Sequence, residues 1–234
     1  ILELGNQYMR FYRDNGQILS GGSPFEISTP YLTAELFDIK FAQSADVMYI
    51  THPNHQTRKL SRTGHTSWTL TVVDFTNGPY LDTNTSTTTI TASAHTVGTG
   101  RTFTASASTF VSTDVDRLIR FRDGYAKVTG FTSATVVTVE IIKDTGSTSA
   151  STDWSLGAFS DTTGHPSCVS FFEQRLVFAA TLSQPQTVFF SKSGDYENMD
   201  ANIGGTVADD DAIIYTIASN QVNAIRFMTA TRTL

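Results

Sequence analysis

Residues 56–64, QTRKLSRTG, have a counterpart 130 residues downstream in residues 186–194, QTVFFSKSG. Both stretches end in the same order: an apolar residue, a serine, a basic residue, a small hydroxyl residue and a glycine. The match continues upstream, where residues 47–50 (VMYI) align with residues 177–180 (VFAA), and a turn containing proline follows in both copies. A repeated pair of strands is typical of folds that place one structural unit beside the next.

Repeated β-units predict blades of a β-propeller. The alternative is that two unrelated hairpins share turn residues, because hairpins use the same few residues at their turns. Short segments rich in β-branched and aromatic residues, separated by Gly, Pro and Asn, extend along most of the chain. We expect strands at residues 46–50, 57–61, 67–73, 118–122, 125–129, 135–142, 175–179, 187–191 and 212–217, and an apolar strand around Cys168.

Composition also favours an all-β chain. The 234 residues include 37 Thr, 23 Ser, 16 Phe and 8 Tyr, and only 16% are charged. Threonine and aromatic residues suit pleated, half-exposed strands. The net charge of −6 provides no basic stripe that could hold nucleic acid by counterion release. The single cysteine cannot form an intrachain disulfide, and no apolar run approaches the length of a membrane span.

The region between the two repeat copies differs in composition. Residues 82–89 (DTNTSTTT) and 144–152 (DTGSTSAST) are rich in Thr and Ser, and strands containing Trp68 and Trp154 are expected outside them. We therefore expect three parts: propeller-like blades over residues 1–81, an inserted small all-β barrel or sandwich over residues 82–150, and further blades over residues 151–234. The core expected for the inserted module is Ile90, Phe103, Phe110, Leu118, Phe121, Val128, Phe131, Val137, Val139 and Ile141.

Both ends of the chain read as strands. Residues 1–4 and 8–13 are strand-like, and Asn15-Gly16 fits a type I′ hairpin turn. Near the other end, Ala224–Met228 has the same character. A natural protein rarely begins within a hairpin and without Met, so we expect the chain to be a segment of a longer protein. A short helix is expected only at Thr33–Asp38.

Histidines and carboxylates offer two candidate metal sites. His52 and His55 have a His-x-x-His spacing, yet no Cys, third His or acidic residue stands nearby in the sequence with metal-site spacing, which favours a polar hairpin tip. Asp209, Asp210 and Asp211 lack the alternating pattern of a calcium loop, which favours a solvated acidic turn.

The remaining candidate residues, a carboxylate pair, a cysteine and a basic run, give no stronger indication of a catalytic or binding site. Asp195 and Glu197 flank Tyr196, as in sugar sites, but a glycosidase needs two carboxyls at a defined separation. The apolar context of Cys168 favours a small buried hydrophobe over a reactive thiol. The basic run Arg58–Arg62 with His65 favours a solvated strand face over a contact with an acidic partner. We therefore predict no catalytic residue, no cofactor and no metal.

Several stretches resemble a known family. Residues 41–53, 60–62, 171–178, 191–198 and 209–213 are similar to tail proteins of short-tailed bacteriophages, of the nozzle or tail tubular protein B type. Residues 101–106 and 113–120 resemble a small β-domain that shares its name with a domain of ubiquitin-activating enzymes; this name implies no ubiquitin chemistry. No catalytic residue accompanies either resemblance.

The resemblance implies a structural subunit of the virion. In that family six copies form a ring around the channel through which DNA leaves the capsid, with adaptor and fibre proteins as neighbours. An acidic protein with few cations is compatible with DNA in transit. Two alternatives stay open: a carbohydrate-binding module or adhesin that uses surface aromatic residues, and a polysaccharide-cleaving enzyme with a carboxylate pair.

Overall fold

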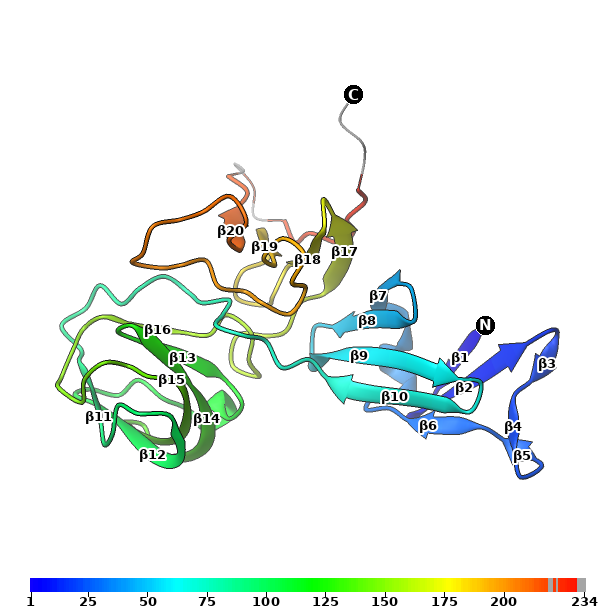
Figure 1. Ribbon diagram of the computed structural model, residues 1–234, viewed down its shortest axis with the longest axis horizontal. Helices are drawn as coiled ribbons and strands as arrows, with labels where there is room; N and C mark the ends of the chain where they lie inside the picture. The colour runs from blue at the N-terminus through cyan, green and yellow to red at the C-terminus, as the bar shows by residue number, and fades with distance from the viewer. Residues whose placement is uncertain (219–220, 222, 231–234) are drawn as a thin grey trace.

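The computed structural model describes residues 1–218, 221 and 223–230. Within this part of the chain the fold is all-β, as predicted, with five antiparallel sheets or ribbons (Figure 1). Two short 3₁₀ helices, η1 (Thr33–Asp38) and η2 (Ser112–Asp114), are its helical elements, and η1 lies where the helix was expected. No helix of the described residues has the length and apolar character needed to cross a bilayer.

The N-terminal sheet consists of β1 (Leu2–Gly5), β2 (Tyr8–Arg13), β3 (Gly16–Gln17) and β6 (Glu26–Ser28), and β4 (Leu19–Ser20) pairs with β5 (Ser23–Pro24) beside it. The hairpin turn lies one residue earlier than predicted. Arg13 pairs with Gly16, so Asp14 and Asn15 form the turn, with φ of 51° and 60°. Asp and Asn tolerate positive φ, which leaves Gly16 free to pair in the strand.

A second sheet follows as β7 (Lys40–Ser44), β8 (Val47–His52), β9 (His55–Gly64) and β10 (Ser67–Val72), each strand paired with the next. Successive side chains of a strand point to opposite faces. Ile50 and Leu60 therefore pack in a core with the N-terminal sheet, whereas Tyr49 packs in a second core with residues of the C-terminal part. This sheet has hydrophobic contacts on both faces.

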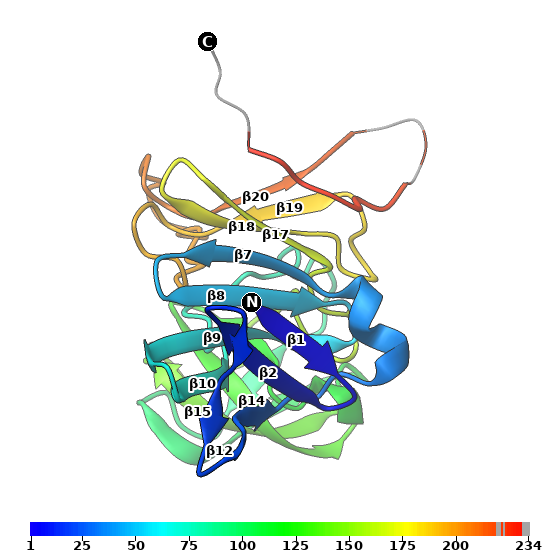
Figure 2. The same cartoon turned by 90° about the vertical axis from the view of Figure 1, so that its right-hand side faces the viewer.

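The C-terminal sheet repeats this order with β17 (Cys168–Phe172), β18 (Arg175–Ala179), β19 (Thr187–Phe190) and β20 (Ile213–Thr216). Every residue of β18 is buried. The first strands of the two sheets lie side by side, because β17 contacts β7 and β8 (Figure 2). The core they share includes Phe178 and Phe189, which pack edge-on around Phe159.

The two copies of the repeat form the central hairpins of these two sheets. Their pairing differs by one residue: Val47 pairs with Ser61, whereas its equivalent Val177 pairs with Phe190, the equivalent of Leu60. A bulge between Ile50 and His52 produces this shift in the first copy. A bulge adds one residue to one strand and redirects the side chains that follow it.

Residues 90–156 form a six-stranded sheet that curls into a half barrel (Figure 1). Its order is β11 (Ile90–Ala92), β12 (Gly98–Ala105), β15 (Val136–Lys143), β14 (Gly124–Ser133), β13 (Leu118–Phe121) and β16 (Trp154–Leu156). Gly124 admits no side chain, since a Cβ there would lie 2.2 Å from the carbonyl oxygen of Lys143.

The core of this sheet contains the predicted residues except Leu118 and Phe131. Leu118 packs in a separate small cluster with Tyr80 and Tyr125, and Phe131 is 39% exposed. Trp154 was expected outside the module but belongs to its core, because β16 pairs with β13.

The prediction of a strand at Ala224–Met228 is wrong. The backbone at these residues pairs with no other strand. The amide N–H of Ile225 donates one hydrogen bond to the carbonyl oxygen of Pro185. The sequence also left β4 to β7, β11 and β12 unassigned, whereas the strand expected at Trp154 is β16. The unassigned strands are short or rich in Thr, Gly and exposed positions, so their apolar alternation is weak.

We expect Phe103→Ala to lower the free energy of unfolding by about 3–5 kcal/mol, because the ring is fully buried against Phe121 at 5.4 Å between ring centroids. Urea unfolding followed by the fluorescence of Trp154, which lies in the same core, measures the change. Phe131→Ala is the matched control and should cost less than about 1 kcal/mol, as a half-exposed ring does. Equal costs for the two variants would contradict this description of the core.

Candidate functional site

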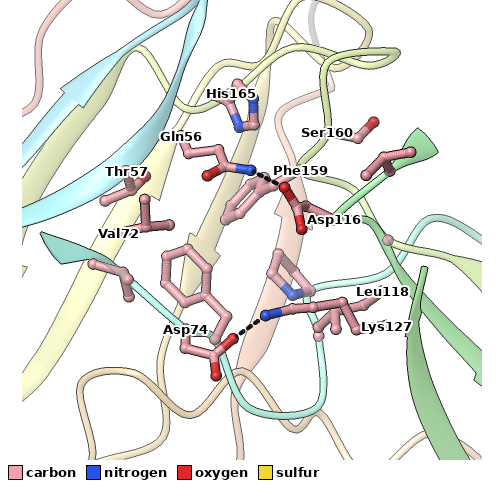
Figure 3. A pocket seen from close by; sticks show the side chains of 16 residues that line it. Gln56, Thr57, Val72, Asp74, Asp116, Leu118, Lys127, Phe159, Ser160 and His165 are labelled. Atoms are coloured by element: carbon pink, nitrogen blue, oxygen red, sulfur yellow. Dashed lines mark hydrogen bonds and ion pairs between the residues drawn. The ribbon is translucent and has the colours of Figure 1, made fainter. Parts of the chain in front are cut away.

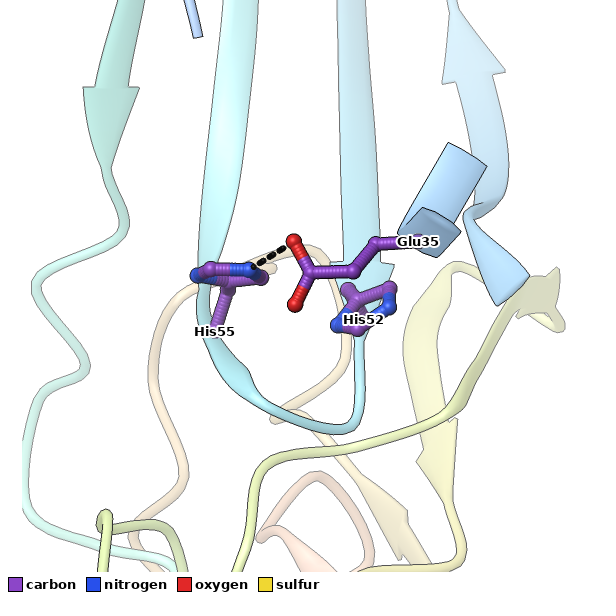
Figure 4. Close-up of side chains that lie close together, drawn as sticks. All are labelled: Glu35, His52 and His55. Atoms are coloured by element: carbon purple, nitrogen blue, oxygen red, sulfur yellow. Dashed lines mark hydrogen bonds and ion pairs between the residues drawn. The ribbon is translucent and has the colours of Figure 1, made fainter. Parts of the chain in front are cut away.

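His52 and His55 lie beside an acidic side chain, Glu35, which the sequence analysis did not associate with them. The two histidines face each other across the β8–β9 turn, with 5.0 Å between ring centroids. Glu35, on η1, places its carboxylate between them, and its Oε2 lies 2.9 Å from His55 Nε2 (Figure 4). One potential ligand atom from each of the three residues lies within 4.8 Å of the other two.

Backbone amides orient two of these three side chains. The amide N–H of Asn54 donates to Nδ1 of His52 at 3.1 Å, so the hairpin turn itself orients that ring. The amide N–H of Leu32 donates to Oε2 of Glu35 at 2.9 Å, which holds the carboxylate at the start of η1. Only His55 has its side chain fixed mainly by another side chain, the Glu35 carboxylate.

Buried polar atoms without a partner adjoin this cluster. His52 is 1% exposed, and its Nε2 has no hydrogen-bond partner. Tyr31 is fully buried, its ring packs edge-on against His55 at 5.3 Å, and its hydroxyl also has no partner. Buried polar groups are nearly always satisfied, so two unsatisfied ones in one place require an explanation.

The surroundings shift the pKa values of Glu35, His52 and the adjoining Tyr31 in different directions. The Leu32 amide and His55 lower the pKa of Glu35, so the carboxylate is held ionised. Burial lowers the pKa of His52, which keeps that imidazole neutral and available as a ligand. Burial raises the pKa of Tyr31 to about 12, so its hydroxyl keeps its proton. The cluster therefore contains one anionic oxygen donor beside a neutral imidazole.

A cavity of about 300 Å³ lies between β9, β10, β13 and β14 and the segments around residues 75 and 159 (Figure 3). Four of its charged and polar side chains are engaged with one another, whereas the buried hydroxyl of Thr57 has no partner. Lys127 pairs with Asp74, and Gln56 donates to Asp116 at 3.3 Å. These contacts link the six-stranded sheet to the β7–β10 sheet. The cavity therefore lies at the interface between two sheets, called the seam below.

Asp209, Asp210 and Asp211 form an acidic turn that is held by cations. Asp211 is 5% exposed and lies 2.8 Å from Lys192, and Asp210 lies 3.6 Å from the same ammonium group. The prediction of a wholly solvated turn is therefore corrected for Asp211. No group that could hold a metal ion includes these residues within the part of the chain that the structure describes.

Glu197 links the two repeat sheets. Its Oε1 accepts a hydrogen bond from the Tyr49 hydroxyl at 2.9 Å and pairs with Lys59 at 2.5 Å. Burial, together with Glu197, raises the pKa of Tyr49, which therefore stays protonated as the donor. Tyr196 packs edge-on against Phe171, and Asp195 accepts from the Asn198 amide at 3.0 Å. This stretch is occupied by contacts between sheets.

The remaining candidates are also engaged in structure. Cys168 is buried, as its apolar context predicts, and burial raises the pKa of its thiol. In the basic run, Lys59 is taken by Glu197, and Arg62 pairs with Asp46 at 3.4 Å beside His65. The basic strand face is thus partly neutralised by the chain itself.

The sequence matches no family model and no curated protein. The family resemblance of residues 41–53 and 171–178 therefore stays a prediction. The support for a function comes from the sheets, edges and side-chain contacts of the chain.

The buried guanidinium of Arg175 secures the acidic turn. It donates to the carbonyl oxygens of Ser191, Asp211 and Asp209 at 2.6, 2.6 and 2.7 Å. We expect Arg175→Met to lower the free energy of unfolding by about 3 kcal/mol, because three carbonyl oxygens, two of them in buried hydrogen bonds, lose a charged donor. Chemical unfolding measures the loss. Arg62→Met, which breaks an exposed pair with Asp46, should leave the midpoint nearly unchanged, and a similar loss in both variants would refute this role.

His165 makes the stability depend on pH. It is 4% exposed and lies 2.9 Å from Asp161, yet burial outweighs that carboxylate and lowers its pKa from the usual 6.5. Between the folded and the unfolded pKa, His165 is therefore protonated in the unfolded chain and neutral in the folded chain. This contribution to stability is complete above about pH 6.5 and is lost as the pH falls towards the folded pKa.

We expect the free energy of unfolding of His165→Gln to fall less steeply between about pH 6.5 and 5 than that of the wild type. The difference in slope is at most about 1.4 kcal/mol per pH unit for one proton. His95→Gln, at an exposed histidine beside Asp144, is the control and should keep the wild-type slope. Parallel curves for the wild type and His165→Gln would disprove the expectation.

Proposed function

We propose that the chain is a structural subunit of a short-tailed bacteriophage tail, of the nozzle or tail tubular protein B type, with no catalytic role. The observation that carries the proposal is the internal repeat, whose copies form the central hairpins of two four-stranded antiparallel sheets of the same strand order. In this proposal β7–β10 and β17–β20 are neighbouring propeller-like blades, and the six-stranded sheet is a module inserted between them.

The packing of the two sheets supports this arrangement. Blades of a propeller converge at their inner strands around a central axis. Here the first strands, β7 and β17, lie against each other (Figure 2), and Tyr49 and Phe178 occupy one common core. The link from Glu197 to Tyr49 and Lys59 joins the same two sheets.

Exposed apolar side chains support assembly into a larger particle. Phe37, Phe41 and Tyr215 are 93%, 62% and 60% exposed, and Phe41 and Tyr215 lie on β7 and β20, which are edge strands of their sheets. Phe41 also borders a mostly apolar groove of about 270 Å³ that is lined by Leu2, Leu4, Met9, Ile39, Met48 and Ile50. Unpaired sheet edges with apolar side chains are normally covered by another chain or segment.

The net charge and the pairing of the cations support a channel wall that lets DNA pass without binding it. The net charge is −6, and most cations of the basic strand face are paired within the chain. A channel wall of this kind repels phosphates or ignores them. In this proposal the protein resides in the virion, contacts further copies of itself and adaptor and fibre proteins, and meets DNA only during ejection.

Carbohydrate binding has less support. Sugar sites present aromatic faces to solvent, yet Trp154 lies in a core and Trp68 stacks on Phe11 at 4.3 Å between ring centroids. Packing therefore occupies both tryptophan rings of the chain. The carboxylates of the seam and of residues 195–197 are engaged in pairs, so an enzymatic role also lacks a free acid–base pair there.

We expect the full-length protein to form rings, six copies by the family resemblance, either alone or with isolated tail components. Light scattering and negative-stain images measure this. Phe41→Lys should reduce the ring population about tenfold, as a loss of roughly 1.4 kcal/mol at the interface does. Val97→Lys, at a similarly exposed residue of the six-stranded sheet region, should have no effect.

A full-length protein that is strictly monomeric and does not associate with tail components would refute the proposal. A glycan array distinguishes the alternative, because specific binding of a sugar by that monomer would identify a carbohydrate-binding module instead. Rings that form equally well with Phe41→Lys would keep the assembly and remove the β7 edge from its interface.

A further inference from the structure

The cluster of Glu35, His52 and His55 has the composition of a transition-metal site. Two imidazoles and one carboxylate are a known zinc ligand set, which leaves one position for water. Their potential ligand atoms lie within 4.8 Å of one another. Ligands of a tetrahedral zinc ion are separated by about 3.3 Å, so the three side chains need to approach by no more than about 1.5 Å.

Two polar atoms that the protein leaves unsatisfied belong to the cluster or to a residue packed on it. Nε2 of His52 is buried without a partner, although the ring lies beside the Glu35 carboxylate (Figure 4). The hydroxyl of Tyr31, which packs on His55, is also unsatisfied. A bound ion with its water provides partners that the protein itself does not supply.

The cluster is open enough to admit an ion. The side chains of Glu35 and His55 are 19% and 23% exposed, whereas His52 is buried beneath them. The two partly exposed groups have room to rotate towards a metal ion. No cation of the protein competes for the carboxylate, which is engaged only by the Leu32 amide and His55 in the described residues.

Metal binding also has a proton balance. When Nε2 of His55, 2.9 Å from Glu35, coordinates the ion, the proton of the neutral ring is carried on Nδ1. His52 accepts the Asn54 N–H at Nδ1, so its neutral ring carries its proton on Nε2. Coordination through Nε2 moves that proton to Nδ1 and turns the ring away from the Asn54 amide.

We infer that Glu35, His52 and His55 bind one Zn²⁺ ion that ties η1 to the β8–β9 hairpin. The ion connects segments that are held together now by a single Glu–His pair and by packing on Tyr31. This inference is independent of the tail proposal, because it concerns the ligands of one subunit.

The test is zinc binding by the chain without a polyhistidine tag, measured by isothermal titration against a competing chelator. We expect one Zn²⁺ per chain and a higher melting temperature of the zinc-loaded protein. Glu35→Gln and His55→Gln should each weaken binding at least tenfold. Asp144→Asn is the matched control, because Asp144 and His95 form an exposed carboxylate–histidine pair with no third ligand.

X-ray absorption at the zinc edge keeps the inference testable if a variant fails to fold. The wild-type complex should show a first shell of nitrogen and oxygen only, with the scattering pattern of two imidazoles. Wild-type protein that binds no stoichiometric zinc, a shell with fewer than two imidazoles, or wild-type affinity in a folded Glu35→Gln variant would each overturn the inference.

Discussion

Tyr49 and Ile50, neighbours on β8, point into different hydrophobic cores, and the rest of the molecule depends on this alternation. Ile50 contributes to the core with the N-terminal sheet, and Tyr49 to the core with the C-terminal sheet. A strand that is buried on both faces has its register fixed by two packing surfaces at once, because a slip of one residue would exchange them. The β8–β9 hairpin is therefore the fixed element against which both neighbouring sheets are placed.

The chain has few charged residues, and several of those that are buried or partly buried connect separate elements. Glu197 joins the two repeat sheets, and Arg175 ties the acidic turn to the end of β19. In the six-stranded region, Arg117 and Asp114 form a buried pair at 2.7 Å, and Arg117 also donates to the carbonyl oxygen of Gly157. With only 16% charged residues, the chain depends mainly on its hydrophobic cores and on these few placed charges.

Local sequence rules predicted the elements whose signal is local. Strands β2, β8, β18 and β20 have strong apolar content and clear turns, and their positions follow from alternation. The turn at Asp14 and Asn15 was misplaced by one residue because Asp, Asn and Gly all suit a positive φ. Ala224–Met228 has the composition of a strand but finds no strand to pair with, which no local rule can detect.

The candidate metal site shows the same limit at the level of side chains. The His-x-x-His spacing is visible in the sequence, but Glu35 comes from another element and reaches the pair only through the packing of η1 on the hairpin. The two-residue turn at Pro53 and Asn54 sets the two histidines opposite each other, because His52 pairs with His55 across it. The equivalent positions in the second repeat copy are Leu182 and Pro185, so that hairpin has the same framework without the ligands. The repeat explains the scaffold, and the two substitutions explain why, of the two hairpins, only the first offers histidine ligands at its turn.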